Sequence, residues 1–240
     1  MLKKFRRKLK KTAIIIEART QSSRYPNKIF KKIGNLTVID FLLNRLSSIK
    51  IQKIVATTKN PKDKKIINLC KKKGINFFAG SKDDLIKRVL DCAKKYNIKY
   101  IVSLTSDNPL VERHYILKYL NLFFKKNLDY IDNIQSKTFP RGFAIRIVKA
   151  SKLKETSKYV RNSKKYNFRQ HTCKFFMDEK NHNRFKGFFV NSRKYIKYRE
   201  LRITIDYKED LKLVNTILMK NNFDINISLN QITKTWDRIK

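Results

Sequence analysis

The stretch AIIIEARTQSSRYPNK, residues 13–28, decides the fold of this chain. It begins with four small or branched apolar residues, Ala13 to Ile16. A short apolar run bounded by polar residues is typical of a buried strand, so we expect a strand over residues 12–18. The chain then enters a polar loop with three cations and two hydroxyls, contributed by Arg19, Ser22, Ser23, Arg24 and Lys28.

The position of this loop indicates a ligand. In open α/β sheets, ligands bind beyond the carboxyl ends of the strands. Guanidinium groups donate paired hydrogen bonds to phosphate oxygens, and a lysine adds a point charge. The loop therefore predicts a polyphosphate site, and a solvated basic loop is the alternative that this segment alone leaves open.

Strand and helix patterns alternate through the first half of the chain. Strands are predicted at 51–58, 75–79 and 100–104, and helices around 38–49, 85–96 and 116–124, with another marked by Ile66, Leu69 and Cys70 that ends near Gly74. This order predicts a three-layer α/β fold with a mostly parallel sheet between helices.

The pattern weakens in the second half. It suggests short strands at 129–134, 143–148, 185–190 and 202–205, a helix at 168–177, and closing helices near 208–220 and 228–237. We expect a single domain over residues 12–240, in which residues 128–200 form an α+β excursion over the active site.

The chain is strongly basic, with a formal net charge of +39 over 240 residues, and 41% of its residues are hydrophobic. A nucleic-acid-binding protein gathers its cations on one face or in one block. Here the lysines are spread over nearly every segment, which favours a solvated basic surface that attracts anionic substrates. We expect no specific nucleic-acid partner.

Cysteines and apolar runs argue against several other classes of protein. Cys70, Cys92 and Cys173 are far apart and odd in number, which indicates neither a disulfide framework nor a zinc site and fits a reducing cytoplasm. The arm MLKKFRRKLKK, residues 1–11, resembles the start of a signal peptide, but the apolar run after it is too short for one. We expect a frayed terminus, or at most a weak contact with an anionic membrane surface. No stretch approaches the length of a membrane span, so we expect no membrane insertion.

A polyphosphate site needs carboxylates that hold a divalent cation such as Mg²⁺. Asp107 directly follows the strand at 100–104 and precedes Asn108 and Pro109, so its carboxylate is expected at the edge of the sheet. An Asx-turn or a helix cap is the structural alternative for this residue. Asp206 follows the apolar segment 201–205 and is a second candidate, although its spacing to Glu209 also fits a helix capping box.

Another acidic cluster lies at the start of the predicted helix 85–96. Ser81 and Asp84 have the spacing of an N-terminal cap, and we favour that structural role over a functional one. Arg88, one turn further on, fits a position in the crevice or on the surface equally well.

The motifs together resemble a known family. The opening stretch is similar to the pattern Q-A-R-x-x-S-S-R-L-P-G-K of sugar cytidylyltransferases, in particular the group named for spore-coat polysaccharide protein F, which is related to acylneuraminate and 3-deoxy-octulosonate cytidylyltransferases. The likeness continues in collinear order through IVATTKNPKD, FFAGSKDDLIKRVLDCAKKY, LTSDNPLV, TFPRGF, FRQHT and RITIDYKEDLKLV.

This resemblance implies a Rossmann-like, nucleotide-diphospho-sugar transferase-like fold and a Mg²⁺-dependent transfer from CTP to a sugar, for a surface polysaccharide or another glycan. It implies catalytic roles for Arg19, Arg24, Lys28 and Asp107, and Mg²⁺ ligation by Asp107 and Asp206. The nucleotide-binding set that it implies is Ala18, Arg19, Ser22, Ser23, Arg24, Lys28, Thr57, Ser81 and Asp84. It implies that the sugar acceptor faces Arg141, Arg169 and His171, and homodimers are usual in related enzymes.

The chain departs from the family pattern near the expected acceptor. Glu17 replaces a glutamine, and Asn27 and Ser106 replace glycines. The family's acidic residues after P-R-G-L appear here as Ala144 and Arg146, and the glutamate beside His171 is Gln170. These departures leave open a homologue that binds nucleotide or sugar without turnover. The net charge of +39 alone leaves open a third hypothesis, a basic protein that binds nucleic acid or an anionic surface.

Overall fold

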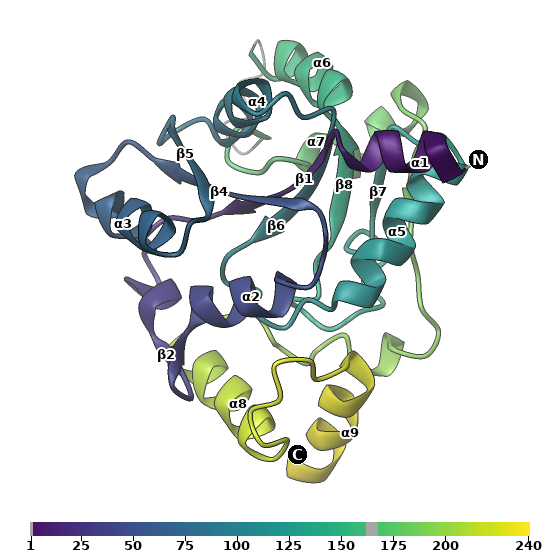
Figure 1. The fold of residues 1–240 in the computed structure, drawn as a ribbon. Coiled ribbons are helices and arrows are strands. Elements are labelled where there is room, and N and C mark those ends of the chain that lie inside the picture. The colour runs from purple at the N-terminus through teal and green to yellow at the C-terminus, as the bar shows by residue number, and fades with distance from the viewer. Residues whose placement is uncertain (1, 162–167) are drawn as a thin grey trace.

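The computed structural model describes residues 2–161 and 168–240. Its central sheet has seven strands in the order β5-β4-β1-β6-β8-β7-β9 (Figure 1). The strands are β1 (Thr12–Glu17), β4 (Gln52–Thr58), β5 (Asn76–Gly80), β6 (Tyr100–Thr105), β7 (Tyr130–Asp132), β8 (Arg146–Lys149) and β9 (Gly187–Phe189). A separate hairpin pairs β2 (Lys32–Ile33) with β3 (Leu36–Thr37).

The sheet is mostly parallel, as the alternating pattern predicts. β1 pairs in parallel with both β4 and β6, and β4 pairs in parallel with β5. β8 is antiparallel to β6 and to β7, while β9 is parallel to β7. The carboxyl ends of β1, β4, β5 and β6 therefore lie along one edge of the sheet, where loops can form a site.

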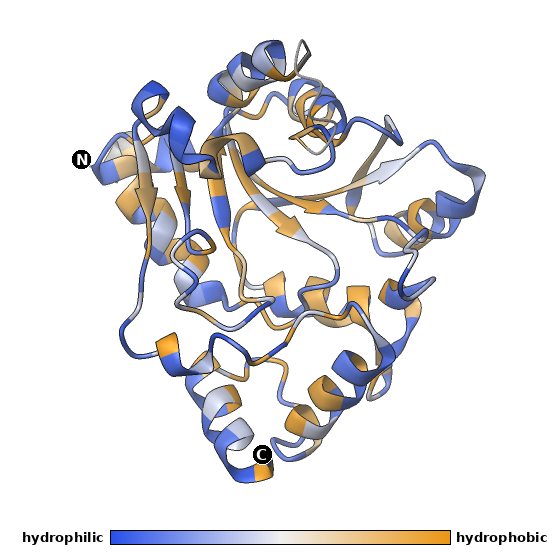
Figure 2. Ribbon diagram, turned by 180° about the vertical axis from the view of Figure 1, so that it is seen from behind, coloured by the Kyte–Doolittle hydropathy of each residue, from blue (hydrophilic) through white to orange (hydrophobic). Residues whose placement is uncertain are grey.

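Helices cover both faces of the sheet, because successive residues of each strand point to opposite faces. On one face, Ile14 and Ile16 of β1 join the core formed with α2 (Val38–Leu46), α3 (Lys64–Lys72), α5 (Arg113–Lys125), α8 (Lys208–Met219) and α9 (Leu229–Ile239). On the other face, Ala13 and Ile15 pack with α4 (Leu85–Lys95), α6 (Ala150–Arg161) and α7 (Lys174–Met177). Figure 2 shows hydrophobic residues along the central strands and hydrophilic residues on the outward-facing sides of the helices.

The expected frayed arm is instead a helix, α1 (Leu2–Leu9). Phe5 and Leu9 are four residues apart, so they share one helical face and pack against the core. The ring of Phe5 meets Phe124 edge-on at 5.7 Å between centroids, and the Thr12 hydroxyl donates to the Lys8 carbonyl at 2.8 Å. The expectation of fraying was wrong because the charge of the arm concealed this apolar face.

Three further expectations for the second half need correction. Residues 202–205 form no strand of the sheet; only Arg202 makes an isolated bridge, with Arg141. The helix expected at 168–177 is α-helical only over Lys174–Met177. The helix α6 was not predicted at all. Residues 130–189 also supply β7, β8 and β9 of the central sheet.

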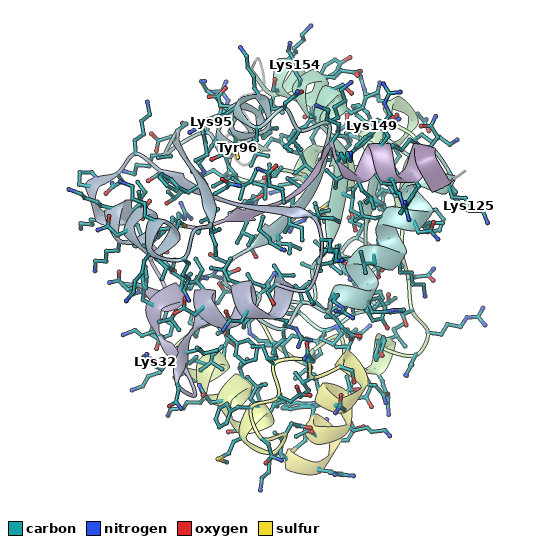
Figure 3. All side chains as sticks on the ribbon, viewed as in Figure 1. Lys32, Lys95, Tyr96, Lys125, Lys149 and Lys154 are labelled. Atoms are coloured by element: carbon teal, nitrogen blue, oxygen red, sulfur yellow. The ribbon has the colours of Figure 1, made fainter. Side chains whose placement is uncertain are left out.

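The basic charge is spread around the molecule. Lys32, Lys125 and Lys154 project from three different sides of the view (Figure 3). This distribution fits a solvated surface better than a single basic face. Among the described helices, none has the length and apolar character needed to cross a membrane.

Candidate active site

The buried carboxylate of Asp63 holds the start of the loop after β1. Asp63 accepts hydrogen bonds from the backbone N–H and the hydroxyl of Thr20, both at 2.7 Å, and from the hydroxyl of Thr58. At the far end of the loop, Asn27 has a left-handed backbone with φ of 55° and donates its N–H to the Thr20 carbonyl at 3.0 Å. Asparagine tolerates this conformation, so the loop closes without the glycine of the family pattern.

Lys28 joins two carboxylates from distant parts of the chain. It opens a short 3₁₀ turn, Lys28–Phe30, and its side chain is only 9% exposed. Its Nζ lies 2.6 Å from Asp107 Oδ2 and 2.9 Å from Asp206 Oδ1. The guanidinium of Arg24 also donates to Asp206 Oδ1, at 2.6 Å. The two aspartates expected to hold a metal thus converge on one nitrogen, next to the basic loop.

Neither aspartate serves as a helix cap. Glu112 is the N-cap residue of α5, which leaves the Asp107 carboxylate for Lys28. At the start of α8, the Asp210 carboxylate accepts from the backbone N–H groups of Asp206 and Tyr207, at 2.8 and 2.9 Å. The capping box expected between Asp206 and Glu209 is therefore replaced by one that uses Asp210, and the Asp206 carboxylate contacts Lys28, Arg24 and Arg202 instead.

Arg202 supports this arrangement. Its guanidinium donates to both oxygens of Asp210, at 2.8 and 3.1 Å, and lies 3.4 Å from Asp206 Oδ2. Arg202 and the two backbone N–H groups hold the pKa of the Asp210 carboxyl below its usual value, against the opposing effect of burial. Asp210 therefore stays charged and keeps the turn before α8 in place.

A cavity of about 240 Å³ lies between the loop after β1 and the chain around Asp107. Its lining includes most of the predicted loop, namely Ala18, Arg19, Ser22, Ser23, Arg24 and Lys28, together with Asp107 and His171. The cavity is also lined by Glu17, Gln21, Lys82, Asp83, Arg88 and Gln170, which were not among the predicted site residues. The cavity thus combines cationic side chains with the carboxylates of Glu17, Asp83 and Asp107. Asp206 does not line it, but its carboxylate contacts the lining residues Arg24 and Lys28.

Arg88 is buried although it is charged, with a relative exposure of 4%. It occupies the core-facing side of α4 beside Val89, and its Nη1 donates to the Ser81 carbonyl at 2.7 Å. Its Nε lacks a hydrogen-bond partner within the described residues. Burial against the cavity places Arg88 in the site, a position that the helical spacing alone does not distinguish from one on the surface.

Glu17 and His171 form another wall of the cavity. The Glu17 Oε1 accepts hydrogen bonds from the hydroxyls of Ser103, at 2.8 Å, and Thr172. Burial lowers the pKa of His171, and the nearby cations Lys174 and Arg146 lower it further. His171 is therefore a neutral hydrogen-bonding group near pH 7.

Arg146 takes the place of a family carboxylate on the same face of the sheet. Burial opposes its charge, but Cys173, Glu17, Tyr130 and Asp132 together raise the pKa of its guanidinium. The negative charge gained at Glu17 therefore offsets only part of the positive change at Arg146, where an arginine stands in place of a carboxylate.

Several predicted residues lie outside this cavity. Arg141 is exposed, pairs with Glu200 at 3.1 Å and lines a separate cavity of about 490 Å³. Arg169 and Asp84 line a third cavity, of about 590 Å³, between α4 and α6. Ser81 and Asp84 cap α4: Asp84 accepts from the Lys87 N–H at 2.8 Å, and the Ser81 hydroxyl accepts from the Asp84 N–H at 3.1 Å. Thr57 is fully buried on β4 and does not line the 240 Å³ cavity.

The sequence model of the family described as Cytidylyltransferase matches residues 13–231. The chain belongs to the cytidylyltransferase family. It is 34% identical over 227 residues to an uncharacterized protein of Methanocaldococcus jannaschii, a match that covers 93% of this chain and 89% of that protein. It is 24% identical to the spore coat polysaccharide biosynthesis protein SpsF of Bacillus subtilis, with 93% of each chain covered.

A solved cytidylyltransferase from Leptospira borgpetersenii serovar Hardjo-bovis superimposes on this cytidylyltransferase with a TM-score of 0.87. The two are 31% identical, and the match covers 95% of this chain and 94% of that one. The resemblance stated from the motifs and the expected nucleotide-diphospho-sugar transferase-like fold are both confirmed.

Proposed function

We propose that this cytidylyltransferase is a Mg²⁺-dependent enzyme that couples CTP to an acidic or amino sugar for a surface polysaccharide or another glycan. The observation that carries the proposal is the meeting of Asp107 and Asp206 at the Lys28 ammonium, beside a loop rich in cations. The family membership supports cytidylyl transfer, and the name of the Bacillus subtilis relative supports a polysaccharide pathway.

In the proposed reaction a sugar hydroxyl attacks the α-phosphorus of CTP. A bond forms between that oxygen and the α-phosphorus, the bond to the β-phosphate oxygen breaks, and CMP-sugar, pyrophosphate and a proton are released. Arg19, Arg24 and Lys28 bind the departing pyrophosphate, because guanidinium and ammonium groups stabilise the charge that develops on it. The chain contributes positioning and charge, as enzymes of phosphoryl transfer generally do.

The two carboxylates that meet at Lys28 suit a divalent cation. Mg²⁺ is usually bound by one or two carboxylates together with substrate phosphates, not by a complete protein cage. Among the described residues, three or more acidic, histidine or cysteine side chains nowhere gather into a metal site, but Asp107 and Asp206 supply two carboxylates. These aspartates would hold the ion, which when bound neutralises phosphate charge.

The acceptor end of the cavity is proposed to lie by His171. Of the three acceptor candidates, only His171 lines the cavity with Asp107 and the basic loop. The neutral His171 can hydrogen-bond a sugar hydroxyl, and Arg88 offers positive charge to a sugar carboxylate. Glu17 has one oxygen engaged by Ser103 and Thr172, and its second oxygen could accept from a sugar hydroxyl or amino group.

A pyrophosphate-release screen tests the proposal. CTP, UTP, ATP and GTP are each combined with acidic and amino sugars, in Mg²⁺ or in EDTA. We expect release only with CTP, Mg²⁺ and a sugar, and a loss of about 100- to 1,000-fold in Asp107→Asn, since that variant removes charge stabilisation. The matched control is Asp91→Asn, because Asp91 pairs with Lys87 on the exposed side of α4. Full activity in Asp107→Asn would refute the mechanism.

Binding without turnover is the second candidate function. The altered residues Ala144, Arg146 and Gln170 favour it, because they remove carboxylates from the presumed acceptor region. Calorimetry distinguishes the two candidates: CTP binding with no pyrophosphate from any sugar tested would support a non-catalytic homologue.

A further inference from the structure

We propose that the turn Pro140–Gly142 is a positioning element that places the Asp206 carboxylate opposite Asp107. This inference rests on the proposed function, in which the two aspartates hold the divalent cation. It gives the TFPRGF motif a role through its backbone, distinct from the contact with the sugar acceptor that the resemblance implies for Arg141.

The segment that leads to Asp206 depends on this turn for its backbone partners. Residues 201–205 are not part of the seven-stranded sheet. The Arg141 N–H donates to the Leu201 carbonyl at 2.8 Å. The Arg141 carbonyl accepts from the N–H groups of Ile203 and Thr204, at 2.7 and 3.1 Å. Both backbone groups of one residue therefore hold the chain just before Asp206.

The same segment is tied directly to the other aspartate. The N–H of Ile205 donates to the backbone carbonyl of Asp107 at 2.9 Å. Asp107 and Asp206 are thus connected by one backbone hydrogen bond and by their shared contact with Lys28. A shift of residues 203–205 would separate the two carboxylates.

Gly142 permits this close packing. Its φ of +101° lies outside the range that residues with a side chain normally adopt. A Cβ atom at this position would lie 2.7 Å from the carbonyl carbon of Ile203, 2.8 Å from Thr204 Cα and closer still to the Thr204 nitrogen. These are backbone atoms, so they cannot rotate away as a flexible side chain would. A side chain at residue 142 must push the Asp206 segment outward.

The side chain of Arg141 contributes little to this role. It is 55% exposed and its described partner is Glu200, which is itself 72% exposed. Surface ion pairs of this kind add little stability. The positioning effect therefore comes from the backbone of the turn and from the missing side chain at Gly142.

The test compares Gly142→Ala with Gly74→Ala. Gly74 also has a positive φ, of +63°, but a Cβ there would meet no atom within 4 Å, so this control reports backbone strain without the clash. Mn²⁺ binding in the presence of CTP is measured by electron paramagnetic resonance, and CTP binding in EDTA by calorimetry. We expect Gly142→Ala to weaken Mn²⁺ binding by about 10- to 100-fold, the range seen when a group supporting a metal ligand is lost. CTP binding in EDTA and both properties of Gly74→Ala should stay near wild type.

Pro140→Ala is a milder second variant, because it relaxes the turn without adding volume at residue 142. If Gly142→Ala fails to fold, Pro140→Ala replaces it in the test, and we expect Pro140→Ala to weaken Mn²⁺ binding as well. Unchanged Mn²⁺ affinity in a folded Gly142→Ala protein, or an equal loss of CTP affinity in EDTA, would overturn the proposal.

A further readout separates this inference from the proposed function. If the wild-type protein binds no Mn²⁺ with CTP, the proposed function fails and the placement of Asp206 can still be tested. Acetylation of the Lys28 amine, followed by mass spectrometry, reports whether Asp206 still covers it. Faster acetylation in Gly142→Ala than in Gly74→Ala supports the positioning role, and equal rates refute it.

Discussion

Replacing Lys28 by methionine removes the ammonium that stands between Asp107 and Asp206. The side chain of Lys28 is 9% exposed, and those of the aspartates are 23% and 16% exposed. Removing one partner of a fully buried ion pair destabilises a protein by about 3–5 kcal/mol, whereas exposed pairs contribute about 0–1 kcal/mol. Because the carboxylates are partly solvated, we expect an intermediate loss of about 2 kcal/mol in the free energy of unfolding.

Divalent cations should reverse this loss. Without the ammonium, two carboxylates face each other with Arg24 as the nearest remaining cation, so the vacated position favours Mg²⁺. For a chain of this length a loss of about 2 kcal/mol lowers the melting temperature by about 4–8 °C. Thermal unfolding without nucleotide, in Mg²⁺ or in EDTA, measures both effects. Mg²⁺ should raise the melting temperature of Lys28→Met much more than that of the wild type.

The control for this experiment is Lys32→Met. Lys32 is exposed, and its ammonium donates to the Asn35 carbonyl at 3.2 Å and to no other group in the described part of the chain. Its removal should therefore alter neither stability nor the response to Mg²⁺. If Mg²⁺ stabilises Lys28→Met no more than the wild type, the two carboxylates do not form a cation site and the reasoning is refuted.

Three other outcomes follow from buried polar groups. Asp63→Asn should raise the KM for CTP in the pyrophosphate assay and lower stability by about 1–3 kcal/mol, because the Thr20 and Thr58 donors lose a charged acceptor; an unchanged KM would contradict this role. Arg45→Met should lower the free energy of unfolding, measured with urea, by about 3 kcal/mol. The buried guanidinium of Arg45 donates to four backbone carbonyls, and burial lowers its pKa to about 10. A loss below about 1 kcal/mol would contradict this structural role. Because the pKa of His171 is lowered in the folded protein, its contribution to stability is present above pH 6.5 and is lost as the pH falls toward the folded-state pKa. The free energy of unfolding should therefore fall less steeply below pH 6.5 in His171→Asn than in the wild type. Identical pH profiles would argue against this contribution.

The site residues that directly follow a predicted strand could be placed from the sequence. The run Ala13–Ile16 fixes the central strand, and the end of that strand places Arg19, Arg24 and Lys28 at the edge of the sheet. Asp107 follows the neighbouring parallel strand, so its approach to Lys28 follows from the topology.

Other parts of the site depend on tertiary contacts that spacing does not reveal. Asp206 follows a segment held by a turn and not by the sheet, and whether Asp206 or Asp210 caps α8 is decided by Arg202. Arg141 is carried away from the cavity by the same turn that fixes Asp206. Arg88 is charged but buried, a combination that composition and periodicity alone do not distinguish from a surface position.

The late position of Asp206 along the chain affects how the protein matures. During synthesis, the N-terminal elements leave the ribosome first and can begin to fold before the rest. A nascent chain that ends before residue 206 already carries the basic loop and Asp107, but it has only one of the two carboxylates that Lys28 contacts. The divalent-cation site proposed above can therefore be completed only after residue 206 has been synthesised and has reached Lys28.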